Sequence, residues 1–288
     1  QHRGRATGLA HGAASTAAPA HRRPLRPRPR APTTGGDPPS TAGPPRSTAC
    51  PSGVPCGAVS SAPLPPLDHH PFLDGLRERA IVLDGGMGTS LQAAGLTAAD
   101  FGGDALDGCN EVLVRTRPDV IERVHRDFLD VGVHAVQTDT FGGAPWVLDE
   151  YGLGADTEEL NRLAAEVARR AADAYATADD PRFVIGSIGP GTRAPTLSLG
   201  KDPTDTRDYI DVMVMEEGYR RQVRGLLDGG SDVILIETCF DLLQIKAAVA
   251  AANDVFVERG ERVPLMVQFT VEKDINTLLL GTEPPAAI

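Results

Sequence analysis

The feature that most constrains the fold is an alternation of short apolar runs with amphipathic stretches, which begins near residue 72. Four of the five runs are almost continuously apolar, as is typical of parallel strands covered on both faces. The alternation therefore predicts a parallel sheet with right-handed helical crossovers. The predicted strands cover residues 80–83, 133–137, 183–187, 232–236 and 264–271.

The stretches between these runs carry apolar residues at helical spacing. Pro118 suits a first helical turn, and glycines such as Gly132 and Gly260 suit helix ends. The predicted order is therefore βαβαβαβαβ. The predicted helices cover about residues 118–131, 160–171, 210–226 and 242–256.

Such an order can close in two ways, as an open doubly wound sheet or as a barrel. An open nucleotide-binding sheet needs Gly-x-Gly-x-x-Gly or a Walker-type Lys after its first strand. The loop Asp84-Gly-Gly-Met-Gly-Thr89 has neither. A barrel places polar residues at the carboxyl end of strand after strand. We therefore predict an α/β fold, a TIM-type (β/α)8 barrel represented here by about five βα units.

The first 68 residues differ sharply from the rest. Residues 1–66 hold eight Arg, no Lys and one Asp, a charge of +7, and have few large apolar side chains. Such a composition predicts a disordered tail at 1–68, followed by the barrel segment at 69–288. The Arg-rich run 22–30 leaves open a nucleic-acid or partner patch, and a transit peptide is a further alternative.

The charge of the body limits its partners. Because the whole chain carries −11, residues 67–288 carry −18, so we expect no nucleic-acid binding. No stretch is long and apolar enough for a membrane span, so we expect no membrane partner. The four cysteines include no Cys-x-x-Cys pair, which favours a reducing, cytoplasmic setting.

Polar side chains follow each predicted strand. Asp84 ends the first strand and Glu237 the fourth, while amides and hydroxyls follow the others. If the strands are sequential in a barrel, these side chains meet on one face. The two carboxylates would then form a general acid/base pair, as in glycosidases, or hold an ammonium group. A turn or cap role for Asp84 and a rim salt bridge for Glu237 are the structural alternatives.

Other candidates are weaker. Asn110 and Glu111 lie in a polar loop that could reach the pocket, or form a solvated turn. We expect His125 at the surface or half-buried, and Met87 and Trp146 in packing roles. A glycosidase would want aromatic platforms, and aromatic residues make up only 5% of the chain, which disfavours that reading.

The body resembles the N-terminal homocysteine-binding domain of cobalamin-dependent methionine synthases. The matching stretches occur in family order across about residues 72–288. They are Asp84-Gly-Gly-Met-Gly-Thr89, Gly108-Cys-Asn-Glu111, Thr116-Arg-Pro-Asp119, Gln137-Thr-Asp-Thr-Phe-Gly142, Gly186-Ser-Ile-Gly-Pro-Gly-Thr192, Glu237-Thr-Cys-Phe-Asp-Leu-Leu-Gln-Ile-Lys-Ala-Ala248 and Gln268-Phe-Thr-Val271.

The resemblance implies a barrel that binds homocysteine, with Asp84 and Glu237 holding its amino group. It implies methyl transfer from methylcobalamin, recharged by 5-methyltetrahydrofolate, to the homocysteine sulfur. Gln137 and Asp139 depart from the Glu and Asn that relatives often carry, which alters the expected pocket charge. The implied substrate-binding residues are Asp84, Gly85, Gly86, Met87, Asn110, Thr138, Asp139, Thr140, Gly189 and Glu237.

The resemblance also implies a zinc ion held by three cysteines, but this chain lacks all three ligand positions. We expect the folate and cobalamin modules to lie outside it too, as parts of a full-length protein. By itself the chain is expected to be inactive, unstable and unable to bind zinc tightly. A cobalamin-independent homocysteine S-methyltransferase and a non-catalytic amino-acid-binding barrel remnant are the alternatives.

Overall fold

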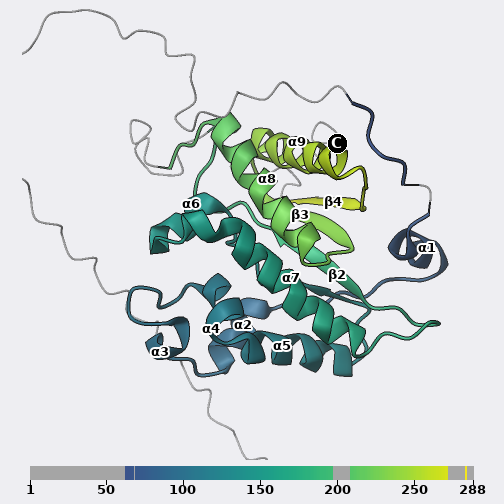
Figure 1. The fold of residues 1–288 in the computed structure, drawn as a ribbon, viewed down its shortest axis with the longest axis horizontal. Coiled ribbons are helices and arrows are strands. Elements are labelled where there is room, and N and C mark those ends of the chain that lie inside the picture. Colours follow the sequence, from purple (N-terminus) through teal and green to yellow (C-terminus); the bar gives the residue numbers. More distant parts are fainter. Residues whose placement is uncertain (1–61, 68, 197–207, 272–282, 284–288) are drawn as a thin grey trace, which may run out of the picture. The chain divides into compact units, whose positions relative to one another are not determined.

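A computed structural model describes residues 62–67, 69–196, 208–271 and 283 of this chain (Figure 1). All of them belong to the unit Val54–Ile288. Of the predicted tail, residues 1–68, only 62–67 are described. The predicted disorder and the Arg-rich run 22–30 therefore lie outside the described residues.

A four-stranded parallel sheet forms the centre of this unit, in the sequential order β1-β2-β3-β4. The parallel sheet predicted from the apolar runs is thus confirmed. All its carboxyl ends lie at one edge, because neighbouring strands run in the same direction. The strands are β1 (Ala135–Gln137), β2 (Phe183–Ile188), β3 (Val233–Cys239) and β4 (Leu265–Phe269).

The prediction of a strand at residues 80–83 is wrong. Only Leu83 pairs with the sheet, as an isolated parallel bridge to Ala135. Val82 donates its backbone N–H to Nδ1 of His134, at 3.0 Å, instead of to a strand carbonyl. The chain then turns into the Gly85-Gly86 loop, so a regular ladder does not develop.

Helices cover one face of the sheet, and they lie in the order α5, α7, α8 and α9 (Figure 1). Alternate strand residues such as Val184 and Ile234 point toward them, since successive side chains of a strand point to opposite faces. The four predicted helices are confirmed: α7 and α9 are longer than predicted, α5 ends one residue earlier, and α8 is shifted by two residues. They are α5 (Pro118–Asp130), α7 (Thr157–Asp173), α8 (Val212–Asp228) and α9 (Leu242–Arg259).

Local sequence explains where these helices begin. Pro118 starts α5, where its missing N–H has no helical partner to lose. Asp211 caps α8 by accepting a hydrogen bond from Met213 N, and Asp241 caps α9 by accepting one from Leu243 N. Such carboxylate caps satisfy N–H groups that the first helical turn leaves unpaired.

Short elements complete the unit. One of them, α1 (Pro71–Glu78), covers the second face of the sheet, where Phe72 packs edge-on against Phe183 at a ring separation of 5.3 Å. The others precede or connect the main helices. They are α2 (Met87–Ala93), α3 (Ala98–Phe101), η1 (Asn110–Val112), α4 (Leu113–Thr116), α6 (Pro145–Leu148), η2 (Asp149–Tyr151) and η3 (Gly154–Asp156).

Helices α7 and α8 approach each other closely at two glycines of one face. A Cβ at Gly225 would overlap the carbonyl oxygen of Glu158, and one at Gly229 would overlap that of Arg162. The overlapping atoms are backbone, which cannot rotate away. The close contact between these helices therefore depends on glycine at both positions.

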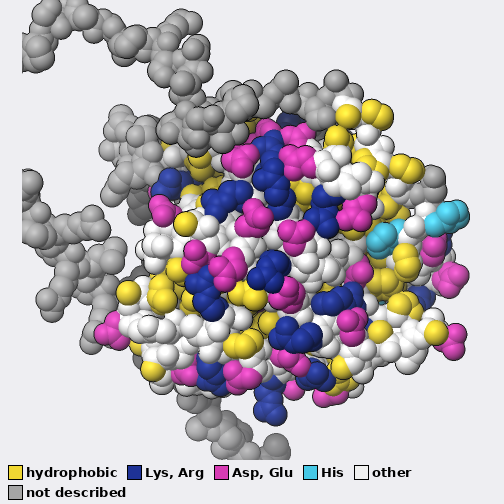
Figure 2. Space-filling model, in the orientation of Figure 1, with side chains coloured by type: hydrophobic (Ala, Val, Ile, Leu, Met, Phe, Trp, Pro, Cys, Tyr) yellow, Lys and Arg dark blue, Asp and Glu magenta, His cyan; other side chains and the backbone are white. Residues whose placement is uncertain are grey.

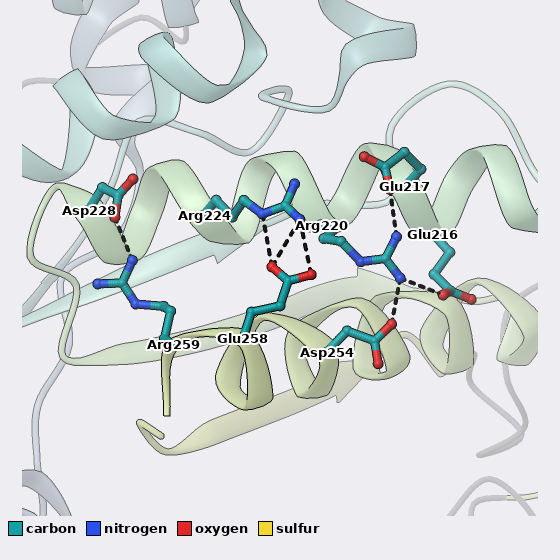
Figure 3. Close-up of polar contacts among 8 residues, drawn as sticks. All are labelled: Glu216, Glu217, Arg220, Arg224, Asp228, Asp254, Glu258 and Arg259. Atoms are coloured by element: carbon teal, nitrogen blue, oxygen red, sulfur yellow. Dashed lines mark hydrogen bonds and ion pairs between the residues drawn. The ribbon is translucent and has the colours of Figure 1, made fainter. Parts of the chain in front are cut away.

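Charged side chains of both signs are mixed over the helical face in Figure 2 rather than gathered by sign. Several of them form a row of ion pairs between α8 and α9 (Figure 3). Arg220 is the least exposed of the arginines in this row, with a side-chain exposure of 15%, and it contacts Glu216, Glu217 and Asp254. Arg224 binds Glu258 nearer the solvent, at 2.9 Å.

Replacing Arg220 with Met should lower the free energy of unfolding by about 2 kcal/mol, between the usual effects at exposed and buried ion pairs. The loss arises because Glu216 and Asp254, with side-chain exposures of 16% and 17%, would keep their charges without the shared cation. Arg224→Met on the same helix is the control and should cost less than about 1 kcal/mol. If urea unfolding showed that Arg220→Met and Arg224→Met lose the same free energy of unfolding, this ranking would be contradicted.

Candidate functional site

A cavity of about 290 Å³ opens at the carboxyl edge of the sheet. Four carboxylates line it, and its described lining includes no Lys, Arg or His. The cavity therefore suits a ligand with a cationic group. The lining residues are Asp84, Gly85, Gly86, Met87, Gly88, Asn110, Glu111, Gln137, Thr138, Asp139, Phe141, Ser187 and Glu237.

Asp84 is fixed where the bridge at Leu83 ends. Its backbone N–H donates to Ala135 O, at 3.0 Å, and its Oδ1 accepts the N–H of Gln137, at 2.9 Å. Its Oδ2 lies 3.8 Å from Nδ1 of His125 on α5, and only 4% of the Asp84 side chain is exposed. The carboxylate is thus held between the end of β1 and a helix, at the base of the cavity.

The expectation that His125 lies at the surface or half-buried is wrong. Its side chain is fully buried, and neither ring nitrogen has a hydrogen-bond partner among the described residues. It follows Val124 on the stripe that α5 turns inward, and the helix is buried more widely than its apolar residues indicate. His125 therefore packs directly behind Asp84.

Glu237 owes its position to an irregularity in β3. The pairing with β4 shifts between Ile236 and Cys239, and Thr238 has a left-handed backbone with φ of 60°. This conformation is strained for a β-branched residue and changes the direction of the neighbouring side chains. Ser187 on β2 then donates its Oγ proton to Glu237 Oε1, at 2.6 Å.

A small hydroxyl network joins the ends of β1 and β2 beneath the cavity. Thr138 Oγ1 donates to Thr140 Oγ1 at 2.6 Å, and Thr140 Oγ1 donates to the carbonyl of Ser187 at 2.7 Å. The N–H of Ser187 donates back to Thr138 Oγ1 at 3.0 Å. Gln222 of α8 also donates to the carbonyl of Thr140, so the network is anchored to the helical layer.

Two lining carboxylates have perturbed acidity. Burial, followed by repulsion from Glu111, raises the pKa of Asp139 well above its ordinary value. Burial also raises the pKa of Glu111, although hydrogen bonds from its own N–H, from Gly142 N at 2.7 Å and from the Cys109 thiol act in the opposite direction. Perturbed groups in a cavity are typical of functional sites.

The structure brings eight of the ten predicted substrate-binding residues to the cavity. Thr140 and Gly189 do not line it, because Thr140 is buried in the hydroxyl network and Gly189 packs under Phe141. The set predicted for substrate binding omitted five lining residues, although the strand-end pattern pointed to Gln137 and Ser187. The five are Gly88, Glu111, Gln137, Phe141 and Ser187.

The described residues do not fit a zinc ion. No group of three or more His, Cys, Asp and Glu side chains among them has metal-binding geometry. Burial raises the pKa of the Cys109 thiol to about 11 and that of the Cys239 thiol to about 12, so both stay protonated at neutral pH. A cysteine binds zinc as a thiolate.

Comparison with known proteins gives the family. Residues 81–288 match the family described as homocysteine S-methyltransferase. The chain belongs to this family. It is 43% identical over 217 residues to methionine synthase of Mycobacterium tuberculosis strain H37Rv and 42% identical over 217 residues to that of Mycobacterium leprae. Each match covers 75% of this chain, and the chain spans 17% of the length of each relative.

Solved structures give the same family. The metallated form of the homocysteine methyltransferase MmuM from Escherichia coli matches with a TM-score of 0.59 and 25% identity, over 76% of this chain and 72% of that one. Its oxidized form matches with a TM-score of 0.56 and 24% identity, over 73% and 69%. Among the described helices of this chain, none is long and apolar enough to cross a membrane.

Proposed function

We propose that this chain is the homocysteine-binding part of a methionine synthase, an enzyme that transfers a methyl group to the sulfur of homocysteine. The observation that carries the proposal is the 43% identity to a methionine synthase over 217 residues. The family match at residues 81–288 includes every residue lining the cavity. The acidic lining suits the ammonium group of an amino acid.

In this proposal Asp84 and Glu237 hold the substrate ammonium from two sides of the cavity. Each carboxylate keeps a fixed orientation because a neighbour binds one of its oxygens, Gln137 N for Asp84 and Ser187 Oγ for Glu237. Fixed orientation lowers the entropy lost on binding. Gly85 and Gly88 have open space where a Cβ would lie, which lets a ligand approach the backbone.

We further propose that the sheet is part of a TIM-type (β/α)8 barrel, since its strands are parallel and follow one another in sequence order. Methylcobalamin and methyltetrahydrofolate would act through other modules of such a protein. Zinc, which favours the nucleophilic thiolate of a bound sulfur, would need ligands other than the described residues. A cytoplasmic setting belongs to the same proposal.

A cobalamin-independent homocysteine S-methyltransferase is the second candidate. The likeness to the metallated homocysteine methyltransferase of Escherichia coli favours it. The two candidates share the amino-acid site and differ in the methyl donor. Methyl transfer from methylcobalamin by the intact protein would decide for the first, and transfer from a sulfonium donor without cobalamin would decide for the second.

Titration calorimetry with homocysteine, in the presence and absence of zinc, tests the proposed site. We expect homocysteine to bind, and we expect butanethiol, which has the thiol but no ammonium or carboxylate, to bind too weakly to measure. Zinc should leave the affinity of the chain for homocysteine unchanged, since the described residues offer no zinc site. Equal binding of both thiols, or none of homocysteine, would contradict the proposal.

A further inference from the structure

Among the described residues that line the cavity, Asp139 is the one with a buried side-chain oxygen that lacks a hydrogen-bond partner. Its exposed fraction is 5%, and its Oδ2 has no hydrogen-bond partner among the described residues. A buried carboxylate oxygen without a donor is strongly destabilising, because the ionised group loses its hydration. Asp139 nevertheless lines a cavity whose described wall contains no cation that could compensate.

Glu111 is the charged neighbour of Asp139. It lines the same cavity from η1, and its repulsion adds to burial, the larger cause, in raising the pKa of Asp139. Two carboxylates that share a buried site cannot both ionise readily, so one proton remains between them. A proton on Asp139 would also remove the charge that leaves Oδ2 an ionised acceptor without a donor.

The hydrogen bonds decide which residue carries the proton. Glu111 accepts the N–H of Gly142 at 2.7 Å and lies 3.9 Å from the Cys109 sulfur, a weak donor. Such contacts stabilise an ionised carboxylate, whereas Asp139 Oδ2 has none within the described part of the chain. The proton therefore belongs on Asp139.

We propose that Asp139 is a neutral carboxylic acid beside ionised Glu111, so that this pair adds one negative charge to the cavity instead of two. One consequence rests on the amino-acid site proposed above. The lower negative charge of the cavity reduces its repulsion of the substrate carboxylate and of a substrate sulfur that must become a thiolate.

Among the described residues, the other titratable groups around the pair do not offer a positive charge. Asp84 and Glu237 line the same cavity from the bridge and from β3. The Cys109 thiol and the Tyr151 phenol are neutral, since burial raises the pKa of each. His125 of α5 lies behind Asp84 rather than in the lining. A bound proton is therefore what offsets part of the negative charge of Asp139 and Glu111.

Infrared spectroscopy of the purified protein without substrate tests the shared proton directly. At neutral pH we expect a carboxylic-acid C=O band that shifts when aspartate is labelled with 13C at its carboxyl group. The band should be lost in Asp139→Asn and retained in the control Asp119→Asn, because Arg117 lowers the pKa of that exposed carboxyl. Absence of the band in the wild-type protein would overturn the proposal.

A second variant tests the role of Glu111. In Glu111→Gln the negative charge that acts on Asp139 is removed, so the Asp139 band should move in frequency or vanish. A band unchanged in position would show that Glu111 does not act on the Asp139 carboxyl group and would overturn the proposal. Neither measurement involves homocysteine, so a negative result here is distinct from failure of the proposed function.

The pH dependence of stability gives an independent measure. Folded Asp139 keeps a proton that the unfolded chain releases above the ordinary Asp pKa of 3.8, so the contribution of Asp139 to stability should fall as pH rises above that value. The unfolding equilibrium constant of the wild-type protein, divided by that of Asp139→Asn, should rise by up to about tenfold per pH unit. Parallel pH profiles for the two proteins would contradict the proposal.

Discussion

Replacing Glu237 with Gln is expected to weaken homocysteine binding about 100-fold, close to 3 kcal/mol, while the protein stays folded. Gln keeps an oxygen that can accept the Ser187 hydroxyl, as Glu237 Oε1 does now at 2.6 Å. It removes the charge that holds the substrate ammonium, and Asp84 cannot replace that charge from the other side of the cavity. Titration calorimetry measures the loss.

The matched control is Glu258→Gln, the same chemical change on α9. Glu258 is bound to Arg224 at the protein surface and does not line the cavity, so homocysteine affinity should be unchanged. Circular dichroism and thermal unfolding of both variants report on folding. Wild-type affinity in a folded Glu237→Gln protein would remove this carboxylate from the proposed binding site.

Replacing Gly225 with Ala is expected to lower the free energy of unfolding by about 3 kcal/mol and Tm by roughly 6–12 °C. In an ordinary helix the same change would stabilise by about 1 kcal/mol, so the predicted sign is opposite to helix propensity. The reason is that a Cβ at this position overlaps the Glu158 carbonyl of α7, and α7 and α8 would have to separate.

Gly88→Ala is the control for this prediction. Gly88 also lies in a helix, α2, but open space surrounds the position where its Cβ would be. The stability of the Gly88→Ala protein should be unchanged or slightly increased when both variants are compared by denaturant titration. If Gly225→Ala proved as stable as Gly88→Ala, the close approach of α7 and α8 would not be a constraint on the fold.

Local pattern was enough to predict the parallel sheet and the four main helices. It also predicted that Asp84 and Glu237 lie on one side of the sheet, although Asp84 follows an isolated bridge and Glu237 lies within β3. These features repeat along the chain with the periods of a strand or a helix, so each is encoded within a few neighbouring residues. The same reasoning failed at 80–83, where an apolar run looks like a strand but the His134 ring accepts the N–H of Val82.

Only the tertiary structure decided which polar residues are buried together. His125 follows Val124 in sequence, yet its complete burial behind Asp84 depends on how α5 packs at the end of β1. Glu111 and Asp139 come from η1 and from the residues after β1, and neither segment indicates that the other carboxylate is near. Contacts between such distant segments arise from packing, which periodicity does not encode.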